Sequence, residues 1–158
     1  MTNKEPKYSL SISLNVLNHL GIKLYSNIPA VLSEVVANSW DADASEVTVT
    51  LADNEIVIED NGHGMNVEDI NSRFLYVGYD RRKDGKAVTQ KFERPVMGRK
   101  GIGKLSLFSI ADKITVESKK GAETNGFMLD AKVIQEKLED IDGPMVYEPD
   151  EIPTQDIK

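Results

Sequence analysis

Residues 34–42 read Glu-Val-Val-Ala-Asn-Ser-Trp-Asp-Ala and lie within a predicted helix. At 100° per residue, Glu34, Asn38 and Asp41 fall within roughly 60° of one another on such a helix. The opposite arc carries apolar side chains, namely Val31, Leu32, Val35 and Val36. A carboxylate that can accept a proton from water, one turn from an amide oxygen that can bind magnesium, suits the hydrolysis of a phosphoanhydride. Taken alone, the same polar stripe is more typical of a solvated helix face.

The predicted helix begins at Pro29 and ends within residues 41–44, because proline favours the first helical position. Upstream, leucines recur at helical spacing over residues 8–20, which predicts an earlier helix. Downstream, apolar residues alternate over 47–51, and a second apolar run covers 56–58 after an Asp-Asn turn. These two runs predict an antiparallel hairpin.

Residues 59–65, Glu-Asp-Asn-Gly-His-Gly-Met, follow the predicted hairpin. The carboxylate of Asp60 can accept a hydrogen bond from an exocyclic amine, and Gly62 and Gly64 let the backbone approach a flat ring closely. The stretch therefore suits adenine recognition. Asp-Asn-Gly is also ordinary turn chemistry, which leaves a simple turn as the alternative. His63 is expected to be a loop side chain rather than a ligand or a base.

Residues 98–106, Gly-Arg-Lys-Gly-Ile-Gly-Lys-Leu-Ser, lead into another predicted helix. Three glycines allow backbone N–H groups to point at phosphate oxygens, the helix N-terminus adds its dipole, and three cations add charge. The spacing nearly matches the P-loop G-x-x-x-x-G-K-[ST]. However, Leu105 replaces the hydroxyl that would hold magnesium, and the residues before Gly98 make a poor strand. We therefore rank the P-loop interpretation low and keep the prediction of a phosphate-binding loop.

The segment between these two motifs is predicted to contain a short helix and a long loop. Asn66 and Asp69 resemble a capping box, which predicts a helix over 67–75. Residues 76–95 are rich in glycine and charge and too long for an ordinary connector, which is typical of a lid or a disordered segment.

The remaining sequence predicts two helices and two strands, followed by a tail. The expected elements are a helix over 104–111, strands over 113–118 and 125–130, a helix over about 131–139, and an acidic, proline-containing tail or truncated linker over 141–158.

The composition narrows the function classes. The chain has 158 residues, no cysteine and a net charge of −7. Disulfides, thiolate metal sites and thiol redox chemistry are therefore excluded. No apolar run approaches the roughly 20 residues that a membrane span needs, and the first residues lack the hydrophobic stretch of a secretory signal. A cytoplasmic location is expected.

Basic residues gather in one segment. Residues 81–104 carry 9 basic and 2 acidic side chains, whereas residues 1–80 carry 4 and 12 and residues 105–158 carry 6 and 12. A positive segment in an acidic protein would attract a polyanion, either the phosphates of a nucleotide or a nucleic acid. On charge alone, a solvated basic loop fits as well.

Taken together and in this order, the three motifs resemble the N, G1 and G2 boxes of the GHKL ATPases. This family groups DNA gyrase, the 90-kDa heat-shock chaperones, histidine kinases and the MutL mismatch-repair proteins. The resemblance covers about residues 26 to 130. It implies an α+β fold, a two-layer α/β sandwich of the Bergerat type with a mixed, largely antiparallel sheet and helices on one face. It also implies ATP and magnesium as cofactors.

The resemblance implies a role for each motif residue. Glu34 would be the general base for the attacking water, Asn38 the magnesium ligand, and Asp41 a hydrogen-bonding support of the nucleotide site. Asp60 would bind the adenine amino group. The base pocket would be shaped by Gly62, Gly64 and Met65.

Residues 76–104 would form the ATP lid by the same resemblance. The lid residues near the phosphates would be Gly98, Lys100, Gly101, Ile102, Gly103 and Lys104. Ser118 stands where chaperone-like members place a threonine near adenine, and a serine could supply the same hydroxyl. Residues 1–140 are accordingly expected to be the ATP-binding domain, with the tail after them.

Glu34 favours hydrolysis over transfer to a protein. Histidine kinases resemble this site but generally lack a glutamate four residues before the magnesium-binding asparagine. The boxes look closer to the chaperone, MutL and MORC-like group, whose members use a second domain that supplies a lysine to the γ-phosphate. Nothing after residue 140 could be that domain. We therefore expect part of a larger ATP-gated switch or clamp that binds ATP or ADP and turns over slowly alone.

Two other function classes remain open. One is a phosphotransferase of the histidine or protein-serine kinase type on the same fold. The other is a nucleic-acid-binding module that uses the basic residues 81–104. The expected partners are a second copy of the full-length protein in a nucleotide-dependent homodimer, and DNA or a protein client through domains outside this chain. No membrane partner is expected.

Overall fold

The computed structural model describes residues 7–12, 28–76, 87–98, 103–139 and 145–157. Within these ranges every strand pairing is antiparallel, and the strands form three small sheets. The pairs are β1 (Leu10–Ile12) with β6 (Met145–Tyr147), β2 (Val47–Leu51) with β3 (Ile56–Asp60), and β5 (Glu123–Asp130) between β4 (Lys113–Lys120) and β7 (Asp150–Glu151).

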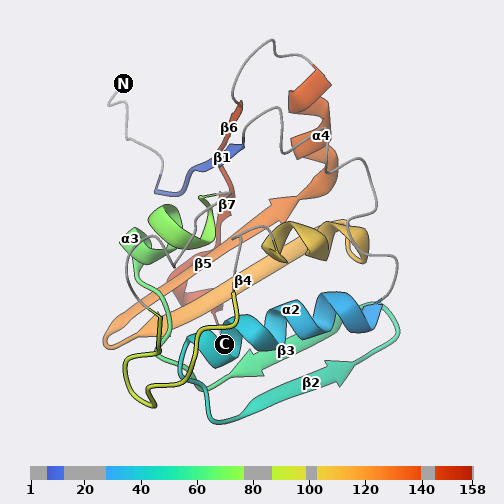
Figure 1. The fold of residues 1–158 in the computed structure, drawn as a ribbon. Helices are drawn as coiled ribbons and strands as arrows, with labels where there is room; N and C mark the ends of the chain where they lie inside the picture. Colours follow the sequence, from blue (N-terminus) through green and yellow to red (C-terminus); the bar gives the residue numbers. More distant parts are fainter. Residues whose placement is uncertain (1–6, 13–27, 77–86, 99–102, 140–144, 158) are drawn as a thin grey trace.

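Helical segments lie before, between and after the strand pairs. In chain order they are α2 (Ile28–Asp41), α3 (Val67–Asp69), the π-helical turn η1 (Ile70–Phe74), the 3-10 helix η2 (Gly103–Ser109), α4 (Ala131–Glu139) and the 3-10 helix η3 (Thr154–Asp156). Helix α2 contacts η2, and near its C-terminal end Ser39 is hydrogen-bonded to Asp60 at the end of β3 (Figure 1). Helices combined with antiparallel sheets confirm the predicted α+β class.

The main core lies where β1, η1, the β4–β5 hairpin, α4 and β6 meet. Its buried members are Tyr8, Leu10, Ile70, Leu75, Ile114, Phe127, Leu129, Ile134 and Tyr147. Phe127 is at the centre, because its ring contacts Tyr8 at 5.1 Å and Phe74 at 5.8 Å between centroids. Aromatic pairs at this separation add to the stabilisation that burial provides.

The local predictions for the middle of the chain are confirmed. Helix α2 ends at Asp41, and the hairpin pairs Val49 with Ile58. Asn66 and Asp69 form a capping box in which each side chain accepts the other residue's backbone N–H. The helix that follows changes from α to π geometry at Ile70, so it is shorter and less regular than the sequence indicated.

The predicted helix over 8–20 is wrong for its described part, because residues 10–12 form β1. Tyr8 and Leu10, two residues apart, are both buried in the core, which is the spacing of a strand. The rest of that prediction lies outside the described residues.

The expected tail also differs from the structure. Tyr147 is buried and pairs with Leu10 in the β1–β6 ladder. Ile157 packs over β5, where a Cβ on Gly126 would come within 2.8 Å of the Ile157 Cδ1 atom. Residues 145–157 therefore belong to the folded unit, since they complete a sheet and cover a strand.

No helix in the described ranges is long and apolar enough to cross a membrane.

Candidate functional site

The C-terminal end of α2 contacts the loop that follows β3. The Ser39 hydroxyl donates to Asp60 Oδ2 at 2.9 Å, and the Gly62 N–H donates to Asp60 Oδ1 at 2.9 Å. The His63 N–H donates to the Ala42 carbonyl at 2.9 Å. These contacts fix the orientation of Asp60, whose side chain nevertheless remains exposed. Each carboxylate oxygen can accept a further hydrogen bond from a ligand.

The two glycines of this loop are required by close packing. A Cβ on Gly62 would lie 2.8 Å from the Ala42 carbonyl oxygen. Gly64 has a φ of 65°, and a Cβ there would overlap the carbonyl group of Lys119 in β4. Positive φ and close backbone approach are the two conditions that favour glycine. The loop is therefore held between α2 and β4.

Ser118 fastens the same loop from the β4 side. Its hydroxyl oxygen accepts the Met65 N–H at 2.8 Å. The structure thus places Met65 and Ser118, together with Asp60, Gly62 and Gly64, in and around one loop.

Asp41 connects α2 to the beginning of the glycine motif. Its Oδ1 accepts the Met97 N–H at 2.8 Å, and its Oδ2 accepts the Gly98 N–H at 2.9 Å. A Cβ on Gly98 would come within 2.9 Å of Asp41 Oδ2. Asp41 is only 5% exposed, so it acts on protein backbone rather than standing open in the site.

The other predicted residues lie on or near the same helix. Glu34 is half-buried and Asn38 is exposed. Gly103 and Lys104 begin η2, which contacts α2. The predicted residues Lys100, Gly101 and Ile102 lie outside the described residues.

The predicted core stripe of α2 is only partly correct. Val31 is fully buried, whereas Val36 is 41% exposed. Ser39 and Asp41, both polar, are buried instead. Their burial follows from contacts with the loops described above, which hydropathy along one helix does not contain.

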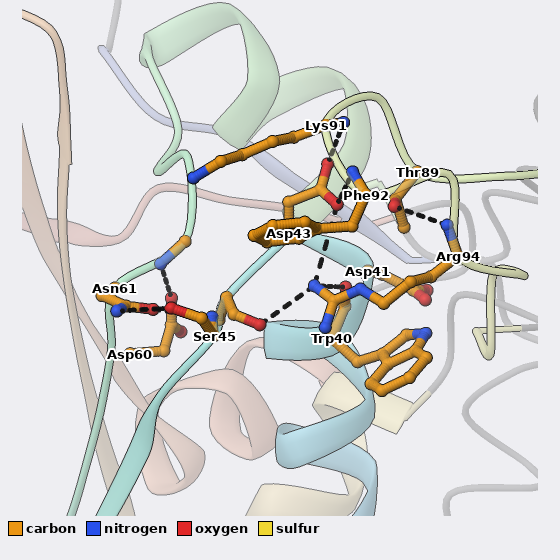
Figure 2. Close-up of polar contacts among 12 residues, drawn as sticks. Trp40, Asp41, Asp43, Ser45, Asp60, Asn61, Thr89, Lys91, Phe92 and Arg94 are labelled. Carbon is orange, nitrogen blue, oxygen red and sulfur yellow. Dashed lines mark hydrogen bonds and ion pairs between the residues drawn. The ribbon is translucent and has the colours of Figure 1, made fainter.

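Residues 87–98, here called the strap, form a feature that the sequence did not predict. The strap folds back on itself through an isolated bridge between Val88 and Pro95 and through hydrogen bonds between Thr89 and Arg94. Figure 2 shows its turn against the end of α2, with Asp43 accepting the N–H groups of Lys91 at 2.9 Å and Phe92 at 3.1 Å.

Arg94 makes the second attachment of the strap. Its guanidinium donates to the carbonyls of Ala44 at 2.9 Å and Trp40 at 3.2 Å and lies 3.7 Å from Asp43. It also stacks over the Trp40 ring at 4.2 Å, and the Trp40 indole N–H donates to the Pro95 carbonyl at 3.0 Å. The available sequence signal was the second acidic residue in Asp-Ala-Asp, two positions after Asp41.

The charge state of Asp43 reflects these contacts. Burial acts to raise the pKa of its carboxyl group. Hydrogen bonds from the Thr89 hydroxyl and from the Lys91 and Phe92 N–H groups, with the charge of Arg94, outweigh burial and lower the pKa from 3.8 to about 2. Asp43 is therefore ionised at neutral pH and holds the strap as a carboxylate.

Metal binding at this site would rely on a nucleotide as well as on protein. In the described ranges no group of three or more His, Cys, Asp or Glu side chains could hold a metal ion. Magnesium is commonly bound through one or two protein oxygens together with phosphate oxygens and water. An exposed amide such as that of Asn38 fits such a shared site.

Comparison with known proteins identifies the family. Residues 25–157 match the family described as "Histidine kinase-, DNA gyrase B-, and HSP90-like ATPase". This chain belongs to that family. The match covers all three motifs and the strap, and it extends through residues 145–157. The resemblance to GHKL ATPases is confirmed, and it supports ATP binding by this domain.

Two kinds of relative are similar to this chain. The "Putative type II restriction enzyme HgiDII" of Herpetosiphon aurantiacus is 49% identical over 122 residues, which are 77% of this chain and 20% of that protein. "Chaperone protein HtpG" of Rickettsia akari is 30% identical over 146 residues, 78% of this chain and 23% of the chaperone. The protein of the same name from Rickettsia canadensis is 27% identical over 161 residues, which cover 87% of this chain and 26% of the chaperone. The chain spans about a fifth to a quarter of these relatives.

The pKa of Asp43 can be measured by following its carboxyl carbon by NMR through an acid titration. We expect a value near 2, and a higher value in Arg94→Gln, because that variant loses the neighbouring positive charge. A folded-state pKa below the unfolded value means that Asp43 stabilises the fold above about pH 4 and that this contribution is lost as the pH falls toward 2. An ordinary Asp43 pKa of 3.8 in the wild type would contradict the described contacts.

Proposed function

We propose that this domain binds ATP with magnesium beside α2 and hydrolyses the terminal phosphoanhydride. The observation that supports the proposal most is the exposed carboxylate of Asp60, which hydrogen bonds from Ser39 and Gly62 hold in place. Ser39 lies near the end of α2, the helix that also bears Glu34 and Asn38. A carboxylate oriented before the ligand arrives loses little freedom on binding, which favours affinity.

The Asp60 carboxylate is proposed to accept a hydrogen bond from the adenine amino group. Gly62, Gly64 and Met65 would line the base, with the loop kept in shape by Ala42, Ser118 and Lys119. The printed contact of the Ser118 hydroxyl is with the Met65 N–H, so we propose that Ser118 acts on adenine chiefly through this loop.

Asn38 and Glu34 are proposed to act at the phosphate end. They are four residues apart on α2 and therefore face the same side of the helix. The Asn38 amide oxygen would bind magnesium, and the Glu34 carboxylate would take a proton from the attacking water. The phosphates would be bound by Gly98, Lys100, Gly101, Ile102, Gly103 and Lys104.

The domain is proposed to serve a larger protein that changes conformation, and forms a homodimer, when ATP binds. The chain spans only 20% of the relative named as a restriction enzyme and 23% of the chaperone from Rickettsia akari, which supports the proposal of a larger protein. We propose that the domain extends beyond residue 140, because strands within residues 145–157 pair with β1 and with β5. A fold shared with kinases keeps phosphate transfer to a protein as an alternative, but Glu34 supports water as the acceptor.

We propose DNA as the client of the full-length protein. Identity to the relative named as a restriction enzyme is 49%, against 30% or less for the two chaperone relatives described above.

ATP binding is tested by calorimetric titration of magnesium-ATP into the wild type and Asp60→Asn. We expect saturable binding that weakens at least tenfold, about 1.4 kcal/mol, in the variant, because the amide removes the negative charge and replaces one of the two acceptor oxygens with a donor. Asp53→Asn, an exposed residue in the β2–β3 turn, is the matched control and should bind like the wild type. Equal affinity in all three proteins would refute the adenine site.

Hydrolysis is tested by phosphate release from this chain and from the full-length protein, with and without Glu34→Ala. We expect slow release from the chain alone and a loss of roughly 10²-fold or more in the full-length variant, with ATP affinity retained. Rapid release by the chain alone would contradict the need for a further domain. Unchanged release in the full-length variant would remove Glu34 as the base.

The DNA proposal predicts that double-stranded DNA stimulates ATP turnover by the full-length protein several-fold. Phosphate release is compared with DNA, with an unfolded protein, and with neither, at fixed ionic strength because DNA binding depends on salt. Stimulation by the unfolded protein alone would instead favour a chaperone.

A further inference from the structure

Asp43 and Arg94 have no part in the nucleotide roles proposed above, yet they attach the strap to the C-terminal end of α2. We propose that they are positioning residues for phosphate binding: they clamp the strap to the C-terminal end of α2 and so fix the start of the glycine motif relative to Glu34 and Asn38. The proposal rests on the function proposed above.

Asp43 occupies a position that normally favours glycine. Its φ is 60°, its N–H donates to the Trp40 carbonyl, and the Ala44 N–H donates to the Ser39 carbonyl. This is the Schellman pattern that ends many helices, and glycine is the usual residue at its left-handed position. An aspartate there costs on the order of 1 kcal/mol of backbone strain. What it provides instead is a carboxylate that accepts two N–H groups of the strap.

Arg94 supplies the positive charge that the end of α2 lacks. The last turn of α2 contains no basic residue, although Asp41 and Asp43 place negative charge there, which the helix dipole disfavours. The Arg94 guanidinium reaches from the strap to the Trp40 and Ala44 carbonyls and to Asp43. A cation at this end of a helix is stabilising.

The guanidinium is also enclosed by aromatic rings. It stacks over Trp40 at 4.2 Å and Phe92 at 4.8 Å. Its Nε atom is buried with no hydrogen-bond partner in the described residues, a cost that the ring contacts offset. A lysine could keep the charge but not this planar, stacked arrangement with two carbonyl acceptors.

The clamp is connected to the phosphate end of the site by a short path. Arg94 is four residues before Gly98, and Asp41 accepts the Met97 and Gly98 N–H groups within that span. The adenine loop is held differently, by Ser39, Ala42, Ser118 and close packing on Lys119, none of them in the strap. Loosening the clamp should therefore impair phosphate binding and spare adenine binding.

Asp43→Gly separates positioning from folding. Glycine suits the left-handed backbone, so the helix end is retained, while the carboxylate that holds the strap is removed. Arg94→Lys tests the planar contacts without changing the charge. Lys91→Gln is the matched control, because it removes a strap cation whose side chain, within the described part of the chain, contacts only the Phe92 ring, at 4.7 Å.

The experiment measures the affinity of each protein for magnesium-ATP and for adenosine by calorimetry. We expect Asp43→Gly and Arg94→Lys to bind ATP at least tenfold more weakly and adenosine within twofold of the wild type, since small displacements of binding groups are costly. Lys91→Gln should match the wild type for both ligands, and Asp60→Asn should lose affinity for both.

Two results would overturn the clamp while leaving the ATP site intact. One is wild-type ATP affinity in Asp43→Gly and Arg94→Lys. The other is an equal loss for ATP and adenosine in both variants, which would mean a general structural role. A wild type that binds neither ligand would instead refute the proposed function, and the clamp with it.

A second measurement does not depend on nucleotide. Amide hydrogen exchange at Met97 and Gly98 should accelerate about tenfold or more in both clamp variants, whereas exchange at Gly62 and Met65 should remain unchanged. Unaltered exchange at Met97 and Gly98 would show that the clamp does not hold the motif, and would end the proposal even if a variant were unstable.

Discussion

The carboxylate of Asp41 holds the backbone of Met97 and Gly98 against the last turn of α2, and the arrangement of the site depends on this contact. Charge-assisted hydrogen bonds of this kind contribute roughly 1.5–3 kcal/mol each. These hydrogen bonds offset the unfavourable interaction between the Asp41 carboxylate and the helix dipole, which disfavours a negative charge at a helix C-terminus. The N–H groups of Met97 and Gly98 therefore stabilise the Asp41 carboxylate at the helix end, and the carboxylate in turn fixes the position of this backbone segment.

The same end of α2 organises the second loop. The Ser39 hydroxyl donates a hydrogen bond to Asp60, and the Ala42 carbonyl accepts one from the His63 N–H. The loop after β3 and the glycine motif are therefore both attached to the same end of α2. A helix is a rigid element, which makes it a suitable support for groups that must meet a single ligand. The proposed base and magnesium ligand project from that helix one turn apart.

Local signals predicted the elements in the middle of the chain but not the contacts between distant segments, and the roles of the site residues stay predictions. The hairpin and the capping box follow from turn chemistry and periodicity, and the structure agrees. The place of Ser118 near adenine was implied only by the family resemblance, and the structure shows its hydroxyl accepting the Met65 N–H. The strand at Leu10 and the burial of Tyr147 could not be predicted in this way, because each depends on a partner far away in the sequence. Arg94 looked like one cation among the nine of a basic segment, since nothing in the sequence shows that it faces Trp40.

The proposed site requires that one nucleotide be bound by both loops at once. A crystal structure of this chain with magnesium and a non-hydrolysable ATP analogue tests it most directly. We expect the adenine amino group within hydrogen-bonding distance of Asp60, the phosphates at the motif that begins at Gly98, and magnesium bound by Asn38. A nucleotide seated away from α2, or one that contacts the glycine motif with its base distant from Asp60, would contradict the proposed site.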